Sequence, residues 1–325
     1  GLGDVYKRQD PTSLVEVGSL ELAGRTSAVA AAAGLSYVGK APAGLRVMDV
    51  SVPETPTEIN TLGTQEVPQD IELSGWHAYT AELYRGLVIY DLATPTSPVQ
   101  VGQLNTPGQA RAVDVAGGMA YVADGISGLR VVDISNPASP SELGFVDTPG
   151  TAYGVDVAGS YAFVADAESG LRVIDVSVPA VSAEVGSAPT PDDAREVIVI
   201  GDHAFVAADS SGVRVFDVSV STAPTEVGFF DTGGFATDLV AASDYLYVAD
   251  RFGGIAVLDI SNPTTPVDAG SFVTMGSGYE VAASNGVLVL ADYDAGIVVF
   301  DDCREVEFSD DFEVFDTAAW SNTQP

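Results

Sequence analysis

Basic residues are scarce in this 325-residue chain. It has 13 Lys and Arg residues against 46 Asp and Glu residues, which gives a formal net charge of −33. Such a charge repels nucleic acid and anionic membrane surfaces, and it favours association with cations. The composition therefore excludes nucleic-acid binding. A run of about 18 apolar residues, which a membrane-spanning helix needs, is also absent from the sequence.

Cysteine and histidine are almost missing as well. Cys303 is the only cysteine, so it is either a free thiol or part of a bridge between molecules. His77 and His203 are the only histidines, and they stand three repeats apart in the pattern described next. Two histidines that stand three repeats apart around a ring of repeats cannot meet. The sequence therefore lacks the residues needed for a zinc site or a Ser-His-Asp triad.

What the chain has instead is a glycine-led segment that recurs at a fixed step. The type copy, Gly128 to Pro137, reads glycine, an apolar run, an aspartate and then Ser-Asn-Pro. Seven copies follow one another every 42 residues, and their glycines are Gly44, Gly86, Gly128, Gly170, Gly212, Gly254 and Gly296. A period of about 40–45 residues is typical of propeller blades.

Each repeat predicts four short strands. In the type repeat we expect them at 110–116, at 120–124, in the apolar run after Gly128, and at 141–146. The third run is apolar on both faces and should be covered on both. The sequence therefore predicts an all-β fold, a seven-bladed β-propeller of four-stranded blades. A linear solenoid is the rival, but it would need polar capping repeats.

The two ends of the repeat region support ring closure. The last repeat stops at Asp301 after its third strand, whereas residues 14–22 supply only a fourth strand. Pairing these pieces would complete one composite blade and remove two sheet edges. Missing upstream sequence could add an eighth blade, although the strand count closes at seven without it.

Three segments follow from this pattern. Residues 1–9 are out of phase and resemble a translated adapter, so we expect a non-native scar that leaves the true N-terminus out of view. Residues 10–301 form the propeller. Residues 302–325 form an acidic tail with Phe and Trp residues. This tail is either disordered or similar to a short C-terminal sorting signal of secreted bacterial proteins, with Phe315 in place of a glycine.

The motif Gly-Leu-Arg-Val-Val-Asp-Ile-Ser-Asn-Pro, preceded by Ala-Tyr-Val-Ala-Asp, resembles the LVIVD-repeat family of bacterial and archaeal proteins over residues 10–301. The resemblance implies a β-propeller, usually on secreted or cell-surface proteins, with a poorly defined role. It brings no established catalytic residues. Tyr90 and Phe216 depart from the pattern, because they replace the aliphatic residue before the aspartate.

The periodic aspartates are predicted to be structural. A binding site needs its residue once, whereas a fold needs it in every blade. The aspartate that ends each third run can accept hydrogen bonds from turn amides. The aspartate that opens the preceding loop should act similarly, although Lys40 and Glu82 replace it in the first two blades.

Variation between copies gives the candidate site. Two adjacent positions before the first strand differ from blade to blade, at the point where the chain returns to the central channel. They are either solvated loop positions free to drift or a polar and aromatic ring at the channel mouth. The candidate ligand-binding residues are Gln69, Asp70, Arg111, Tyr153, Arg195, Glu196, Asp238, Tyr279 and Glu280.

A second set lies two residues further on. Glu72, Asp114 and Asp156 form an acidic trio on three adjacent blades, and calcium is the ion this trio could hold. Otherwise we expect no cofactor.

These features predict a monomeric binding module that is secreted or on the cell surface, with an unknown extracellular ligand or protein as its partner. Arg111 and Arg195 suit an acidic glycan or a peptide carboxylate. The alternative is an extracellular hydrolase or lyase whose carboxylates act as acid and base at the channel mouth, but we do not expect an enzyme. Fold alone cannot separate the two functions.

Overall fold

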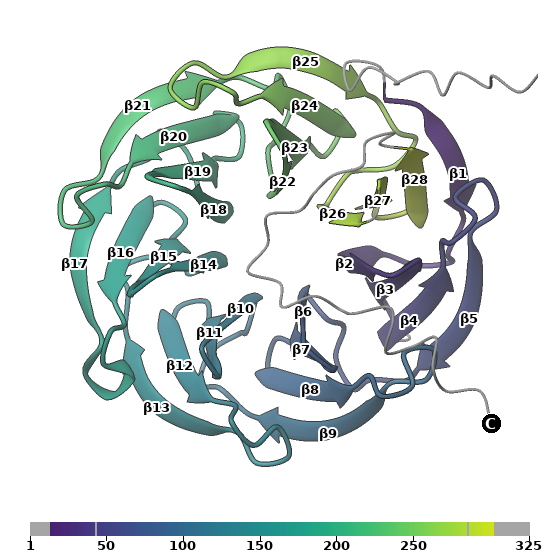
Figure 1. The fold of residues 1–325 in the computed structure, drawn as a ribbon, viewed down its shortest axis with the longest axis horizontal. Helices are drawn as coiled ribbons and strands as arrows, with labels where there is room; N and C mark the ends of the chain where they lie inside the picture. Colours follow the sequence, from purple (N-terminus) through teal and green to yellow (C-terminus); the bar gives the residue numbers. More distant parts are fainter. Residues whose placement is uncertain (1–13, 43, 285, 302–325) are drawn as a thin grey trace, which may run out of the picture.

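The computed structural model describes residues 14–42, 44–284 and 286–301. In these ranges the chain forms seven four-stranded antiparallel sheets that stand around a central channel (Figure 1). The predicted seven-bladed β-propeller is thus confirmed. The one helical segment among the described residues is a single 3-10 turn, Pro179–Val181. None of the described helical structure has the length and apolarity needed to cross a bilayer. The expected scar at 1–9 and the acidic tail at 302–325, with Cys303, lie outside the described residues.

Blades 1 to 6 each use four consecutive strands, from β2–β5 to β22–β25, and blade 7 consists of β26, β27, β28 and β1. The innermost strands are β2 (Thr26–Ala32), β6 (Asp70–Ser74), β10 (Ala112–Ala116), β14 (Gly154–Ala158), β18 (Glu196–Ile200), β22 (Asp238–Ala242) and β26 (Glu280–Ser284). The second strands are β3 (Leu35–Lys40), β7 (His77–Ala81), β11 (Met119–Ala123), β15 (Tyr161–Ala165), β19 (His203–Ala207), β23 (Tyr245–Ala249) and β27 (Val287–Ala291). The third strands are β4 (Gly44–Asp49), β8 (Leu87–Asp91), β12 (Leu129–Asp133), β16 (Leu171–Asp175), β20 (Val213–Asp217), β24 (Ile255–Asp259) and β28 (Ile297–Asp301). The outer strands are β5 (Thr57–Leu62), β9 (Val99–Leu104), β13 (Ser141–Val146), β17 (Ala183–Ala188), β21 (Thr225–Phe230), β25 (Val267–Phe272) and β1 (Glu16–Leu20).

The glycine that opens each third strand is fixed by geometry. Gly128 has φ +69°, and a Cβ on it would lie 2.2 Å from the Val146 carbonyl oxygen of the neighbouring outer strand. Only glycine meets both demands at low cost. All seven repeat glycines have positive φ, which explains why the sequence keeps a glycine every 42 residues.

Apolar side chains fill each interface between neighbouring blades. Phe163 and Leu171 of blade 4, for example, pack with Val206 and Phe216 of blade 5, and all four are at most 2% exposed. Burying each such side chain stabilises the fold by about 1.5–3 kcal/mol. Third-strand residues such as Val131 are fully buried, as their two-sided apolar pattern predicts.

Blade 7 closes the ring as expected. β1 pairs antiparallel with β28, with Leu20 opposite Ile297 and Glu16 opposite Phe300. Figure 1 shows β1 as the outer strand of the blade that β26, β27 and β28 form. Val17 and Leu20 also pack against the apolar cluster between blades 7 and 1. The first described strand therefore completes the last blade.

The periodic aspartates have the structural roles that were predicted. In blades 1 to 6, the aspartate that ends the third strand (the turn aspartate) accepts a hydrogen bond from the amide two residues further on; the Ser177 amide, for example, donates to Asp175 at 2.9 Å. The loop aspartates follow the second strands and are buried: Asp124, Asp166, Asp250 and Asp292. Asp166 accepts from the Thr148 hydroxyl at 2.6 Å and the Gly150 amide at 2.8 Å, which ties the loop to the connection that leads into blade 4.

Candidate functional site

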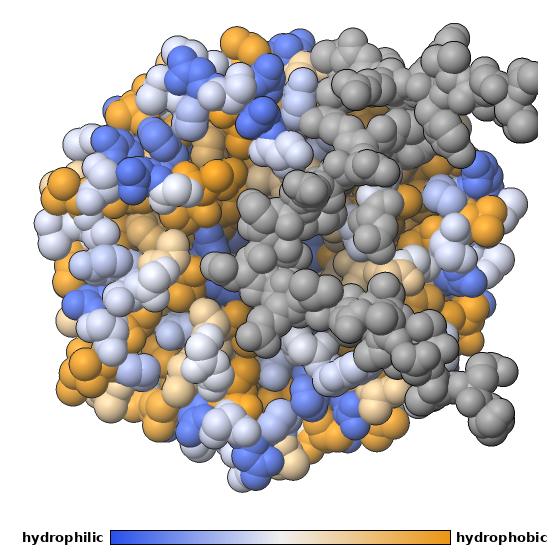
Figure 2. All heavy atoms as spheres, viewed as in Figure 1, coloured by the Kyte–Doolittle hydropathy of each residue, from blue (hydrophilic) through white to orange (hydrophobic). Residues whose placement is uncertain are grey.

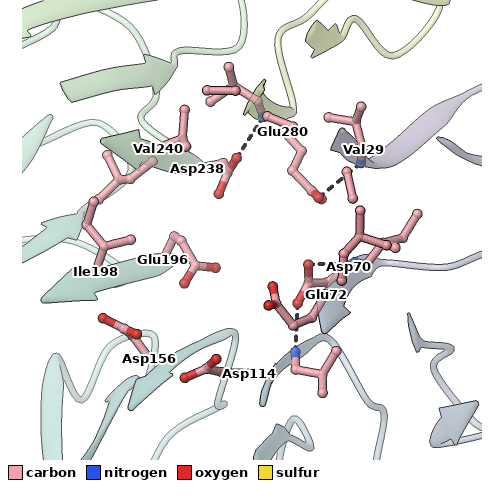
Figure 3. A pocket seen from close by; sticks show the side chains of 18 of the residues that line it. Val29, Asp70, Glu72, Asp114, Asp156, Glu196, Ile198, Asp238, Val240 and Glu280 are labelled. Atoms are coloured by element: carbon pink, nitrogen blue, oxygen red, sulfur yellow. Dashed lines mark hydrogen bonds between the residues drawn. The ribbon is translucent and has the colours of Figure 1, made fainter. Parts of the chain in front are cut away.

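The centre of the ring holds a cavity of about 270 Å³ that the innermost strands line. Its wall carries seven acidic side chains, which we call the channel carboxylates: Asp70, Glu72, Asp114, Asp156, Glu196, Asp238 and Glu280. Figure 3 shows them extending from β6, β10, β14, β18, β22 and β26 toward a common centre. None of the described residues that line the cavity is basic. Blade 1 contributes no carboxylate, because Ala28 and Ala30 stand at the equivalent positions of β2.

The channel carboxylates lie at two alternate positions of the inner strands, the first and third in β6. Side chains two residues apart in a strand point to the same face, so both positions turn toward the next blade. Five of the seven accept an amide on the free edge of the neighbouring inner strand: Asp70, Asp114, Asp156, Asp238 and Glu280. The Val113 amide donates to Asp70 at 2.7 Å and the Val281 amide donates to Asp238 at 2.7 Å. The Val29 amide donates to Glu280 at 3.0 Å across the closure from blade 7 to blade 1.

Burial raises the pKa of every channel carboxylate. Desolvation, partly offset by the backbone amides, raises the pKa of Asp70 and of Asp114 to about 6. Desolvation raises the pKa of Asp156 and of Asp238 to about 7, and neighbouring carboxylates add to the effect. The pKa values of the three glutamates also lie well above the ordinary range, first through burial and then through repulsion from nearby acids. Seven acids thus share one cavity in which a negative charge is costly.

A smaller cavity of about 90 Å³ adjoins the channel and forms its mouth. The two cavities share Asp70, Glu196, Asp238 and Glu280. Hydrophilic residues, blue in Figure 2, are visible in the hollow at the centre of the face shown there. The mouth therefore leads directly to the channel carboxylates.

The arginines at the mouth already have partners. Arg111 and Arg195 both lie over the Tyr153 ring, with guanidinium carbons 4.5 and 4.6 Å from its centroid. Arg195 also forms ion pairs with Asp209 at 2.7 Å and Asp193 at 3.0 Å. Arg111 donates to the Gln109 side chain at 2.8 Å. These contacts hold the guanidinium groups in place and neutralise much of the charge on Arg195.

The structure brings the sequence-derived candidates together. All nine candidate ligand residues line the mouth cavity, and the acidic trio Glu72, Asp114 and Asp156 lines the channel beneath. One detail differs, because Asp70, Glu196, Asp238 and Glu280 are the first residues of inner strands and not loop residues. In the described ranges no three Asp, Glu, His or Cys residues are placed to hold a metal ion. Calcium binding by the trio stays a prediction.

Sequence reasoning missed Arg251, which also lines the mouth. Arg251 follows a loop aspartate and has φ +36°, as Leu83, Ala167, Asp209 and Tyr293 do at the same repeat position with φ between 35° and 46°. Because this positive φ recurs in blades 2 to 7, it belongs to the frame of the repeat. Alignment of the repeats would have shown that the residue after the loop aspartate varies from blade to blade. Only the structure shows that the carboxylates of both inner-strand positions line one cavity.

Comparison with known proteins identifies the repeat. The family model described as "LVIVD repeat" matches residues 23–64, 68–106, 107–148, 149–190, 191–232 and 233–274. No curated protein matches the chain. Among solved structures, the chain is similar to the computationally designed Ika8 protein, with a TM-score of 0.64 and 11% identity over 88% of this chain and 99% of that one. At that identity the likeness shows the fold alone.

Proposed function

The chain belongs to the LVIVD-repeat family, and from this premise we propose that it is a binding module whose central channel takes up a cationic group. One observation carries the proposal: seven carboxylates line a single cavity of about 270 Å³, and none of the described residues lining that cavity is basic. Neighbouring carboxylates repel one another, and a cation that binds among them would offset that repulsion. The net charge of −33 also draws cations toward the protein.

The charge at the site decides between two ligand classes. The arginines at the mouth favour an acidic glycan or a peptide carboxylate in isolation, but Arg195 already pairs with Asp193 and Asp209. An anion that entered the mouth would also face Asp70, Glu196, Asp238 and Glu280. The same carboxylates would attract a cation. We therefore propose a cation as the ligand, and the experiment below also tests an acidic ligand.

The carboxylates could instead perform acid–base chemistry. Asp156 and Asp238, whose pKa values burial raises to about 7, have the proton affinity that suits general acids and bases near neutral pH. A hydrolase or lyase is therefore the second candidate. Turnover of neutral and acidic oligosaccharides by the purified protein, abolished by Asp238→Asn, would favour it over simple binding. The extracellular location stays a prediction that the family resemblance implies.

Thermal unfolding with ligand tests the proposal. At pH 8 and fixed ionic strength we expect calcium chloride or 1-aminobutane hydrochloride to raise the melting temperature, and sodium galacturonate to leave it unchanged. A ligand at about 100 times its Kd adds roughly 2.7 kcal/mol to stability. Cation binding should also release protons, because carboxyl groups with raised pKa values must ionise. Calorimetric heats should therefore depend on the ionisation enthalpy of the buffer.

Two double variants assign the effect to residues. Asp114→Ala with Asp156→Ala should remove most of the cation-induced shift, whereas Arg111→Ala with Arg195→Ala should keep it. A galacturonate-induced shift that only the arginine pair supports would overturn the cation proposal in favour of the acidic ligand. If neither class of ligand changes the melting of the folded wild-type protein, the channel is not a binding site.

A further inference from the structure

The channel carboxylates form two tiers along the channel. The outer tier, which also lines the mouth, consists of Asp70, Glu196, Asp238 and Glu280. The inner tier consists of Glu72, Asp114 and Asp156, which line the channel alone. β6 carries a member of each tier, Asp70 and Glu72, two residues apart. At about 3.3 Å of rise per strand residue, the tiers are separated by about 7 Å.

Glu72 differs from the other inner-tier acids in its hydrogen bonding. The other inner-tier acids accept backbone amides: Asp114 accepts from Val157 at 2.6 Å, and Asp156 accepts from Val199. Within the described residues, Glu72 accepts no hydrogen bond, although it lies in the channel among Asp70, Asp114 and Asp156. Burial and these three neighbours raise its pKa. Glu72 lines the cavity and is partly exposed to it, so a donor from outside the chain can reach its carboxylate and supply a hydrogen bond.

The wall opposite the inner-tier acids is apolar. Ile198 of blade 5 and Val240 of blade 6 occupy the positions that Asp114 and Asp156 hold in blades 3 and 4. Both line the same cavity. A ligand that lies along the channel therefore meets carboxylates at two levels and a hydrocarbon surface beside them. A bare metal ion uses only one level and none of the apolar wall.

We propose that the channel binds a linear aliphatic diamine or polyamine, with one ammonium group in each tier and the methylene chain against Ile198 and Val240. This inference rests on the proposed cation-binding function and names its ligand class. With bonds of about 1.5 Å, the nitrogens of an extended 1,4-diaminobutane or 1,5-diaminopentane lie about 6–7.5 Å apart, which matches the tier spacing. Each ammonium group supplies three donors, and Glu72 receives one of them.

Calorimetric titration of the full chain at pH 8 tests this inference with 1,4-diaminobutane, its matched monoamine 1-aminobutane, and calcium chloride. The diamine should bind at least about tenfold more tightly than the monoamine, a ratio that corresponds to about 1.4 kcal/mol. Glu72→Gln in the inner tier should reduce the ratio to about threefold or less, and so should Glu280→Gln in the outer tier. The side-chain carbonyl oxygen in the Glu280→Gln variant would still accept the Val29 amide, so the ring closure bond is kept.

Glu142→Gln is the matched control, because it removes the same charge from an exposed position on the outer strand β13. It should leave both affinities unchanged. Equal affinity for diamine and monoamine, or a Glu72→Gln effect no larger than that of Glu142→Gln, would overturn the diamine inference and leave cation binding standing. Tighter binding of calcium than of the diamine would also overturn it. Failure of all three cations to bind would overturn the proposed function as well.

Discussion

The loop aspartates and the channel carboxylates are both acids with raised pKa values, but the loop aspartates are buried and the channel carboxylates are partly exposed to the channel. Asp166 accepts from Thr148 and Gly150, and its Oδ2 lies 3.6 Å from the Arg172 Nε atom. Glu72 faces three other acids and has no donor among the described residues. The loop aspartates recur with the repeat, whereas the channel carboxylates occur on blades 2 to 7 at two different heights. The loop aspartates thus stabilise the frame through several hydrogen bonds each, whereas Glu72 has no such bond among the described residues.

Opening the ring should produce the largest effect, because it disturbs both sets of acids. Removal of residues 1–22 deletes β1 and leaves β28 as a free sheet edge. Loss of the packing of Val17, Leu20 and Leu22 against the cluster between blades 7 and 1 should cost about 5 kcal/mol. Chemical denaturation should show a lower midpoint, and light scattering should show aggregation. Removal of residues 1–9 alone is the control and should change neither readout.

Loss of one loop aspartate should come next. Asp166→Ala leaves the Thr148 hydroxyl and the Gly150 amide without their acceptor in a buried site. The expected cost is about 2–4 kcal/mol in urea unfolding. Asp175→Ala removes a turn aspartate with a solvent-exposed hydrogen bond from the same blade and should cost clearly less. Equal costs for the two variants would contradict the distinction between buried ties and exposed turn bonds.

The pH dependence of stability should separate the two kinds of acid further. Asp156 and Asp238 have pKa values of about 7 in the folded protein, above the unfolded value of 3.8. The folded state therefore holds more protons between pH 4 and 7, so stability falls as the pH rises through this range. We expect a loss of about 2 kcal/mol, or roughly 5 °C in melting temperature, between pH 5 and pH 8.

The turn aspartates act in a different window. Hydrogen bonds from the serine two residues further on lower the pKa values of Asp49, Asp133, Asp175, Asp217 and Asp259, so the contribution of these residues to stability is lost only as the pH falls below about 4. A double variant, Asp156→Asn with Asp238→Asn, should flatten the melting profile between pH 5 and pH 8. An unchanged slope in that variant would show that the channel carboxylates do not cause the fall.

The smallest expected effect is a gain. Glu72→Gln removes one charge from the inner tier and breaks no hydrogen bond among the described residues. At pH 8 without added cation, it should stabilise the protein by about 1 kcal/mol, because repulsion from Asp70, Asp114 and Asp156 is relieved. Because the pKa of Glu72 is raised, its carboxyl takes up a proton more readily than an ordinary glutamate, so the gain should shrink as the pH is lowered. Destabilisation at pH 8 would mean that Glu72 has a structural role after all.

The fold could be predicted because glycine and aspartate positions obey local rules. Gly128 is required by its positive φ and by the Val146 carbonyl, and both constraints repeat in every blade. The candidate site could be found as the place where the repeat breaks, as at Arg111, Tyr153 and Glu280. Its charge balance could not be predicted. The pairing of Arg195 with Asp209 depends on contacts between a strand start and a loop of the same blade, and the cavity that joins Asp70 to Asp156 depends on the angle between blades.

The pairing of β1 with β28 also sets an order in time. Each of blades 1 to 6 is a continuous stretch of chain and can form as it leaves the ribosome. Blade 7 instead combines β1, which precedes the other blades in the sequence, with β26, β27 and β28, which follow them. β1 must therefore remain without its partner while the rest of the ring is translated, a period in which an apolar strand would invite misassembly. Glu16 and Ser19 keep one face of β1 polar and exposed in the finished ring. The same polar residues would keep the unpaired β1 soluble until β28 has been translated and can pair with it.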